Sequence, residues 1–316
     1  MLHLHFIQNQ VVMNLNELNN FLQQEMKERN NMPQNDFLGI NPDQMFGLVH
    51  SPLEGDSILK IKKNIPDEIL SKIPFLLLIE HFLKILEREK AVKLTASQGN
   101  LPLKIVAELY APKFILEEAM ELNLYKQAKE EYLYSIQALH INTTLAGLAK
   151  KTAGKLSLTK KGESFVKSPQ KRQELFEHIF KIFCTKYNWG YTDGFSFESI
   201  GQAGFAFSLL MMQNFGNETL PMNFYAEKYI NAFPMEVNHS RKNYTQSGWY
   251  FEGKESPEEL RKSAMSCYSH RTFTHMMDWF GFVEIDTPKD YMKRDETTVK
   301  KTGVLDAVFE GFGLVK

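Results

Sequence analysis

The sequence is poor in cysteine and in net charge, and both absences exclude classes of protein. Its 316 residues include two cysteines, Cys184 and Cys267, which lie far apart and form no C-x-x-C motif. Such a pair excludes a disulfide framework and a cysteine-based zinc site, and it is typical of a reducing compartment. The 37 basic and 38 acidic side chains give a formal net charge of −1. A uniformly basic, histone-like protein is therefore excluded.

Long apolar runs are also missing from the sequence. The richest stretch, residues 73–86, contains Glu80 and Lys84 and is shorter than the ~20 residues needed to cross a bilayer. Residues 1–12 lack the basic start of a secretory signal, and we expect them to form a flexible arm before a helix that begins near Asn14. The sequence thus predicts a cytoplasmic protein without a membrane partner.

The chain does contain enough apolar side chains for a large core. Hydrophobic residues make up 43 % of it, with 24 phenylalanines. This composition excludes disorder, which requires low hydrophobicity and a high net charge. At roughly 150 residues per domain, the length suggests about two domains. Apolar spacing predicts helices over residues 14–26 and 69–86, and the second is apolar on most sides and therefore expected to be buried.

A short strand, a glycine turn and a helix follow one another at three places in the sequence. These copies lie at residues 92–110, 156–165 and 299–309, and helices are expected before the last two, around 144–151 and 256–280. Helices followed by a two-stranded ribbon predict a winged-helix unit, a helix-turn-helix variant in which the hairpin loop forms the wing. An ordinary small α+β packing unit has the same local pattern and stays open.

We therefore predict a mainly α fold with small β-hairpins (α+β), made of winged-helix-like units joined by a helical connector. The expected division is an N-terminal arm with short helices (1–66), a tandem winged-helix-like region (67–170), a helical connector (171–232) and a C-terminal winged-helix-like domain (233–316).

Four motifs in residues 41–195 carry a resemblance to known sequences. They are Asn41-Pro42-Asp43-Gln44-Met45, Leu94-Thr95 with Gly99-Asn100-Leu101-Pro102, Leu156-Ser157-Leu158-Thr159-Lys160-Lys161-Gly162, and Tyr187-Asn188-Trp189-Gly190-Tyr191. On these residues the chain resembles a widespread group of uncharacterised bacterial proteins, over roughly half of its length. Relatives of this kind often carry a SEC-C zinc motif, which needs more cysteines than this chain has. The resemblance implies a bacterial origin and a winged-helix-like fold, and it supplies no catalytic residues.

Motifs for catalysis or cofactor binding are missing. The sequence has no G-x-S-x-G, no Walker loop and no dinucleotide fingerprint. His270 and His275 are five residues apart, about 140° around an α-helix, so we do not expect them to converge on a metal. Gly201 and Gly204 have the spacing of a phosphate clamp, but the apolar run after them predicts the start of a core helix. We predict no catalytic residue, no metal and no cofactor, so an enzyme is the least favoured class.

One segment, residues 147–172, is strongly basic although the whole chain is nearly neutral. It holds eight bases against the single acid Glu163. The bases are Lys150, Lys151, Lys155, Lys160, Lys161, Lys167, Lys171 and Arg172. On a winged helix they would fall on the second helix, the wing and the turn after it, where nucleic acid is contacted. Because lysines make non-directional phosphate contacts, we expect salt-dependent binding of DNA or RNA with little sequence readout. A solvated basic face is the alternative.

A second candidate surface lies in the C-terminal part, in a loop-like segment that mixes polar and aromatic side chains. Its residues are His239, Arg241, Tyr244, Trp249 and Tyr250. Such a loop is typical of a site that binds a protein partner, and a cover over the C-terminal core is the open alternative. The expected wing at 284–301 holds five bases and five acids, a balance better suited to protein contact. Two functions therefore stay open: a non-catalytic module that contacts nucleic acid phosphates, and a protein–protein interaction adapter without nucleic-acid binding.

Overall fold

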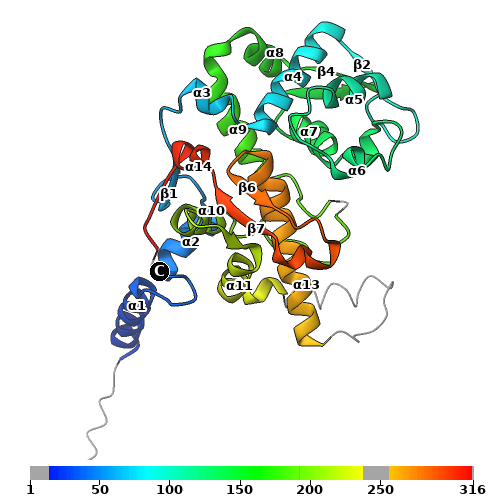
Figure 1. The fold of residues 1–316 in the computed structure, drawn as a ribbon. Coiled ribbons are helices and arrows are strands. Elements are labelled where there is room, and N and C mark those ends of the chain that lie inside the picture. Colours follow the sequence, from blue (N-terminus) through cyan, green and yellow to red (C-terminus); the bar gives the residue numbers. More distant parts are fainter. Residues whose placement is uncertain (1–13, 192, 238–255, 315–316) are drawn as a thin grey trace, which may run out of the picture.

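The computed structural model describes residues 14–191, 193–237 and 256–314. Within these ranges the chain forms many helices and three small antiparallel sheets (Figure 1). The predicted α+β class with small strands is therefore confirmed. No helix in the described ranges is long and apolar enough to span a membrane. The predicted arm at residues 1–12 lies outside the described residues.

The helices are α1 (Leu15–Asn31), α2 (Pro42–His50), α3 (Asp67–Leu70), α4 (Pro74–Glu89), α5 (Leu103–Tyr110), α6 (Glu118–Glu121), α7 (Tyr134–Leu145), α8 (Lys160–Lys167), α9 (Arg172–Thr185), α10 (Phe205–Phe215), α11 (Met222–Ala232), α13 (Pro257–Ser269) and α14 (Gly303–Val308). Short 3₁₀ turns are η1 (Glu130–Tyr132), η2 (Pro169–Lys171) and η4 (Tyr291–Glu296), and η3 (His270–Met277) is a π-helix. The strands are β1 (Leu59–Ile61), β2 (Val92–Lys93), β3 (Ala149–Thr152), β4 (Lys155–Leu158), β5 (Leu220–Pro221), β6 (Val283–Asp286), β7 (Thr298–Lys301) and β8 (Phe309–Gly311).

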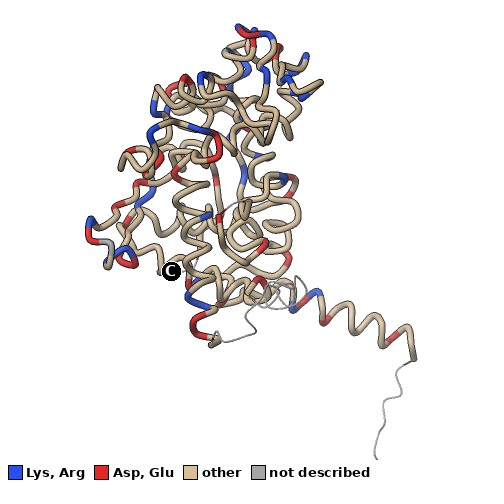
Figure 2. Tube along the Cα trace, turned by 90° about the vertical axis from the view of Figure 1, so that its right-hand side faces the viewer, with Lys and Arg blue, Asp and Glu red and all other residues tan. Residues whose placement is uncertain are grey.

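Several helices begin at capping residues that are visible in the sequence. Asn14 before α1, Asn41 before α2 and Ser256 before α13 each form a complete capping box with the residue three positions later. None of the residues of α1 is buried, and this helix projects from the body of the molecule (Figures 1 and 2). α4 instead buries eight apolar side chains, which confirms the prediction of a central helix there.

A first unit is made of α4, β2, α5, α7, β3 and β4, and its strands have the order β2-β4-β3. Val92 of β2 pairs with Leu156 of β4, while Ala149 of β3 pairs with Leu158. The sequence predicted two successive units in residues 67–170, but both predicted strand segments lie in this one sheet. β2 is only two residues long, and its partner strand comes after three further helices, α5, α6 and α7, so a local sequence pattern could not show the pairing.

Gly162 lies inside α8, not in the turn that the sequence predicted. The hydroxyl of Thr159 caps this helix by accepting a hydrogen bond from the backbone N–H of Gly162. A Cβ atom at Gly162 would lie 2.2 Å from the carbonyl oxygen of Leu148, just before β3. Glycine is therefore required here by the close approach of α8 to the backbone of the first unit.

The same order of elements recurs in the C-terminal half, where α10, β5, α11, α13 with η3, β6 and β7 form a second unit. Its strand order is β5-β7-β6, and Val299 of β7 pairs with both Leu220 and Ile285. α10, β5 and α11 fall in residues 171–232, which the sequence predicted as a helical connector. They complete the second sheet unit, because β7 needs β5 on its other side.

α9 joins the two units and lies in the common core. Phe183 of α9 packs against Phe75 of the first unit, with ring centroids 5.4 Å apart. Phe180, one turn earlier, packs against Phe280 of the second unit at 4.9 Å. β1 pairs with β8, so the segment before α3 lies beside the C-terminal strand. The buried side chains of the described residues consequently form one continuous core.

Candidate nucleic-acid interface

Three lysines stand on the solvent side of the first sheet, one on each strand. Paired residues of an antiparallel ladder point to the same side, and successive residues alternate. Lys93 of β2 pairs with Lys155 of β4, and Lys150 of β3 pairs with Ser157, two residues further along β4. All three lysines therefore point away from the buried side chain of Leu156. We call Lys93, Lys150 and Lys155 the lysine face.

The lysine face is an unneutralised cluster of positive charge. Its three side chains are exposed, and none of them forms an ion pair with a residue of the described part of the chain. Lys93 and Lys155 are directly opposite each other, and like charges in that position destabilise a sheet. Figure 2 shows several Lys and Arg residues, with some Asp and Glu beside them, at the top of the molecule, where Figure 1 places β2 and β4. An anion bound at this face would offset the repulsion.

Protection of a sheet edge does not account for the whole lysine face. Lysine on an edge strand prevents pairing with another molecule, which is a sufficient reason for Lys150 on β3. Lys155, however, lies on the central strand β4, where no edge needs protection. Edge protection therefore explains only part of the cluster.

Lys151 lies on the opposite side of β3 from Lys150, at the rim of a hollow. The hollow is bounded by the β3–β4 turn and by the loop that follows β2, and its lining includes Ser97, Gly99 and Lys151. The turn consists of two residues, Ala153 and Gly154, both with positive φ, as in a type I′ hairpin. This tight turn brings Lys151 close to the end of the sheet.

The other five predicted bases lie outside the hairpin, on α8 or at the start of α9, and they differ in the groups that they contact. Lys160 and Lys161 open α8, and the ammonium of Lys161 is 2.8 Å from Nε2 of His178. Lys167 and Lys171 each lie 3.7 Å from a carboxylate of the same helical segment. Arg172 is mostly buried and holds Glu80 with two hydrogen bonds and Asp67 with another.

Arg172 is therefore a structural residue that joins α9 to α3 and α4, not a phosphate ligand. Its two carboxylate partners raise the pKa of its guanidinium, so the side chain stays charged and engaged. Of the eight predicted bases, Lys150, Lys151 and Lys155 share the hairpin, and the sequence prediction missed Lys93. The alternation of Val92, Lys93 and Leu94, with the two apolar residues buried, was the available signal for Lys93.

The prediction of a helix around residues 144–151 is wrong. α7 ends at Leu145, and both Lys150 and Lys151 belong to strand β3. α7 has no lysine or arginine with which to contact phosphates in a DNA groove. Its buried side chains lie on one face, which packs against α4, α5 and α9, and its other face carries no Lys or Arg. Along its length Tyr134, Thr144 and Leu145 are the exposed residues. The basic surface of this unit is consequently its sheet and not its helix.

The predicted interaction loop lies outside the residues that the structure describes. Its residues are His239, Arg241, Tyr244, Trp249 and Tyr250.

The G-x-x-G segment forms a turn before α10. Gly201 and Gly204 both have positive φ, and Gly204 caps α10 from a left-handed conformation. The N–H of Gly201 donates to the Tyr229 hydroxyl, so this G-x-x-G builds a tight turn before the predicted core helix.

A cluster of aromatic and imidazole rings on η3 was not predicted from the sequence. In a π-helix the hydrogen bonds join residues five apart, so such residues lie one above the other. The rings of His270 and His275 therefore meet, with centroids 4.3 Å apart, contrary to the prediction from α-helical geometry. Tyr134 of α7 packs on His275 and Phe195 packs on His270, each at 5.7 Å. In the described part of the chain no three His, Cys, Asp or Glu side chains are placed to hold a metal.

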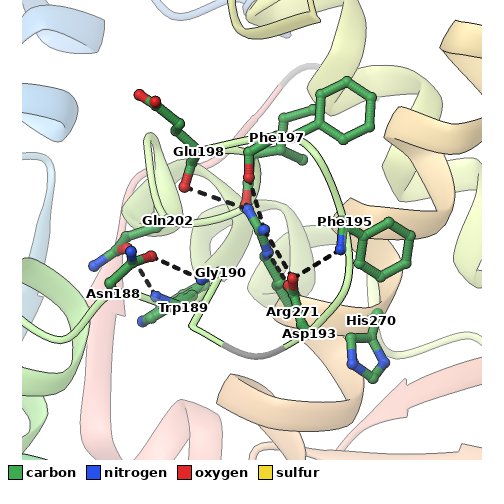
Figure 3. Close-up of polar contacts among 12 residues, drawn as sticks. Asn188, Trp189, Gly190, Asp193, Phe195, Phe197, Glu198, Gln202, His270 and Arg271 are labelled. Atoms are coloured by element: carbon green, nitrogen blue, oxygen red, sulfur yellow. Dashed lines mark hydrogen bonds and ion pairs between the residues drawn. The ribbon is translucent and has the colours of Figure 1, made fainter. Parts of the chain in front are cut away.

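Arg271, between these histidines, is fully buried and saturated with acceptors (Figure 3). Its Nε donates to Asp193 at 2.5 Å, and Nη2 donates to the same carboxylate at 3.3 Å and to the carbonyl of Phe197 at 2.7 Å. Nη1 donates to the carbonyls of Ile200 and Glu198. A Cβ at Gly190 would lie 2.6 Å from Nη2, so glycine leaves the space that the guanidinium needs. This arginine ties the chain between α9 and α10 to η3.

Burial disfavours the charged form of both histidines of η3. Burial lowers the pKa of His270 and lowers that of His275 well below the usual value of 6.5, and the positive charge of Arg271 acts in the same direction on both. Asp193 opposes the shift at His270. The unfolded chain would bind protons at both rings near the usual value, so folding excludes protons from them.

We expect the free energy of unfolding to fall as the pH drops below about 6.5, because the unfolded state then binds more protons than the folded state. Urea denaturation of the wild type and of His275→Phe between pH 7.5 and 5 tests this. The variant should lose less stability over this interval, while His50→Asn, which changes an exposed histidine, should behave as the wild type does. Equal losses in His275→Phe and the wild type would contradict the expectation.

Comparisons with known proteins give no match. No family model, no curated protein and no solved structure matches this chain. The resemblance on residues 41–195 accordingly stays a prediction, and function has to be inferred from the geometry of the chain itself.

Proposed function

We propose that this protein binds nucleic acid, DNA or RNA, by contacting backbone phosphates through the lysine face. The observation that carries the proposal is the arrangement of Lys93, Lys150 and Lys155, one on each strand of an exposed sheet without acidic partners in the described part of the chain. Positive charge that the protein does not neutralise itself is the electrostatic footprint of a polyanion site.

In this proposal both sheet units are winged-helix units. Each has a helix, a strand, at least two further helices (α5, α6 and α7 in the first unit) and then two strands, with the first strand paired to the last. The β3–β4 hairpin is the wing of the first unit and carries Lys150, Lys151 and Lys155. The corresponding region of the second unit, residues 284–301, has equal numbers of acids and bases and is not proposed to bind nucleic acid.

The proposed contact is with the backbone and not with base edges. Lysine ammonium groups bind phosphate without a fixed direction, whereas bidentate base contacts come mainly from Arg, Asn and Gln. α7, the helix that would have to enter a groove, carries no Lys or Arg on its outer face. We therefore expect little sequence specificity and a strong dependence on salt.

A fluorescence-anisotropy salt titration with a labelled duplex tests the proposal. We expect the triple variant Lys93→Glu, Lys150→Glu, Lys155→Glu to bind at least tenfold more weakly at low salt. Its slope of log K against log salt should be smaller by about 0.9 for each phosphate that the variant no longer neutralises. The matched control is the triple variant Lys27→Glu, Lys262→Glu, Lys289→Glu, which makes the same charge change at exposed positions on other elements.

Two outcomes would contradict the proposal. One is the absence of duplex binding by the wild type even at low salt. The other is equal weakening by the two triple variants, which would show that net charge alone, and not the lysine face, governs binding.

A protein–protein adapter is the second candidate, and one observation favours it. α1 exposes its large apolar side chains, including Leu15, Leu18 and Met26, although the helix is otherwise well capped. An exposed apolar stripe of this kind is typical of a protein contact. The salt titration separates the two candidates, because an adapter without nucleic-acid binding gives no duplex affinity at any salt concentration.

A further inference from the structure

The hollow beside the hairpin turn lies at one end of the first sheet, where Lys93 and Lys155 of the lysine face also line it. β2 stops at Lys93, and the backbone N–H of Leu94 donates to the carbonyl of Gly154 in the turn. The loop after β2 then turns back, with a hydrogen bond from the N–H of Gly99 to the carbonyl of Thr95. The two turns therefore lie side by side at this end of the sheet, and both line the hollow.

The hollow contains an ammonium group that is positioned by the fold. In the ladder Lys151 pairs with Leu156 and shares its side of the sheet, yet Lys151 is exposed while Leu156 is buried. Its side chain bends toward the loop after β2, where a Cβ on Gly99 would lie only 2.5 Å from Nζ. Gly99 has φ +75° and no side chain, so the loop both turns sharply and leaves room for this charge.

The lining of the hollow holds three lysines and several polar side chains beside its apolar ones. It includes Lys93, Lys151 and Lys155 together with Ser97 and Gln98, and none of its eleven described lining residues is acidic. Gln98 also accepts a hydrogen bond from the side chain of Asn100, which orients its amide. Such a lining fits a small, multiply charged anion with several oxygen acceptors.

A phosphomonoester fits this lining better than a phosphodiester. A phosphodiester in the backbone carries one negative charge, whereas a monoester carries about −1.5 to −2 near pH 7 and has three acceptor oxygens. Three lysines at one hollow neutralise the higher charge more fully. A strand that ends in the hollow also presents a monoester at its terminus if it is phosphorylated.

We propose that the hollow binds the terminal phosphate of a nucleic acid strand whose backbone lies on the lysine face, with Lys151 as the ligand specific to that phosphate. This inference rests on the proposed nucleic-acid function and adds a preference for phosphorylated ends. Lys93 and Lys155 belong to both the lysine face and the hollow, whereas Lys150 contacts only the phosphates of the nucleic acid backbone.

Two duplexes of identical sequence, one with 5′-phosphates and one with 5′-hydroxyls, test the preference by fluorescence anisotropy with a label on the 3′ end. The wild type should bind the phosphorylated duplex about tenfold more tightly, the size of one charge-assisted hydrogen bond. Lys151→Gln should abolish this ratio. Lys150→Gln is the matched control, because it removes the neighbouring lysine from the other side of the same strand; it should weaken both duplexes equally and leave the ratio unchanged.

A third arm uses adenosine 5′-monophosphate as a competitor to separate a chain end from a free nucleotide. It should displace the phosphorylated duplex only at concentrations well above those of the duplex itself, because it lacks the backbone contacts. Displacement at equal concentration would overturn the assignment to a nucleic acid end. Binding of both duplexes with the same affinity would overturn the inference but leave the proposed function intact, whereas no binding of either duplex would overturn both.

Discussion

Replacing Asp193 by alanine is expected to lower the free energy of unfolding by about 3–5 kcal/mol, the range for removing one partner of a buried ion pair. Arg271 and Asp193 have side-chain exposures of 0 % and 1 %. The variant would leave a guanidinium without a counter-charge in a site that water does not reach, and the carbonyl acceptors of Phe197 and Ile200 cannot neutralise it. Chemical denaturation followed by circular dichroism measures the loss.

Asp295→Ala is the matched control for this prediction. Asp295 also faces a cation, Lys262 at 3.7 Å, but its side chain is 77 % exposed. Its removal should change the free energy of unfolding by less than about 1 kcal/mol. In addition, the double variant Asp193→Leu, Arg271→Met should be more stable than Asp193→Ala alone, because it leaves no charge buried. Similar losses for Asp193→Ala and Asp295→Ala would show that the Arg271 pair is not effectively buried.

Local signals in the sequence were sufficient to predict individual helices, but not to predict which strands pair with each other. The predicted helix starts near Asn14 and Ser256 are confirmed by the caps found there, since a cap acts on backbone groups within one turn. The pairing of β2 with β4 and of β5 with β7 joins segments separated by two or more helices. Strands this short carry almost no periodicity, so their partners become clear only when the helices between them are packed.

For the candidate site as well, the sequence showed the local charge but not the contacts between residues that are distant in the chain. The charge count alone singled out a basic segment, and the structure places Lys150, Lys151 and Lys155 of it on one hairpin, with Lys151 on the opposite side from the other two. Arg172 was assigned to the same cluster because Glu80 and Asp67, which engage it, are distant in sequence. The contact between His270 and His275 was missed for another reason, since the 140° separation assumed for an α-helix does not apply to a π-helix. Side-chain neighbours therefore required the three-dimensional structure even where the residue types were correctly singled out.

Replacing Phe180 by alanine is expected to lower the free energy of unfolding by about 3–5 kcal/mol, the range for deleting a large aromatic side chain from a packed core. Phe180 is fully buried, with 0 % exposure. Its ring packs against five others, those of Phe176, Phe205, Phe280, Phe282 and Phe309. These rings come from separate elements that cannot all move inward, so a cavity would remain. The control is Phe46→Ala, because that ring is 64 % exposed and its loss should change stability by less than about 1 kcal/mol.

Phe180 lies on the helix that contacts both units, so its replacement tests whether the two units unfold together. α9 packs on Phe75 of the first unit through Phe183 and on the second unit through Phe180, so a loss of packing along it reaches both. We therefore expect Phe180→Ala to shift one common transition, seen equally by hydrogen exchange in β4 and in β7. A shift confined to β7 would mean that the two units unfold independently. The core around α9 would then hold the second unit alone, and the lysine face would keep its structure while the rest of the protein unfolds.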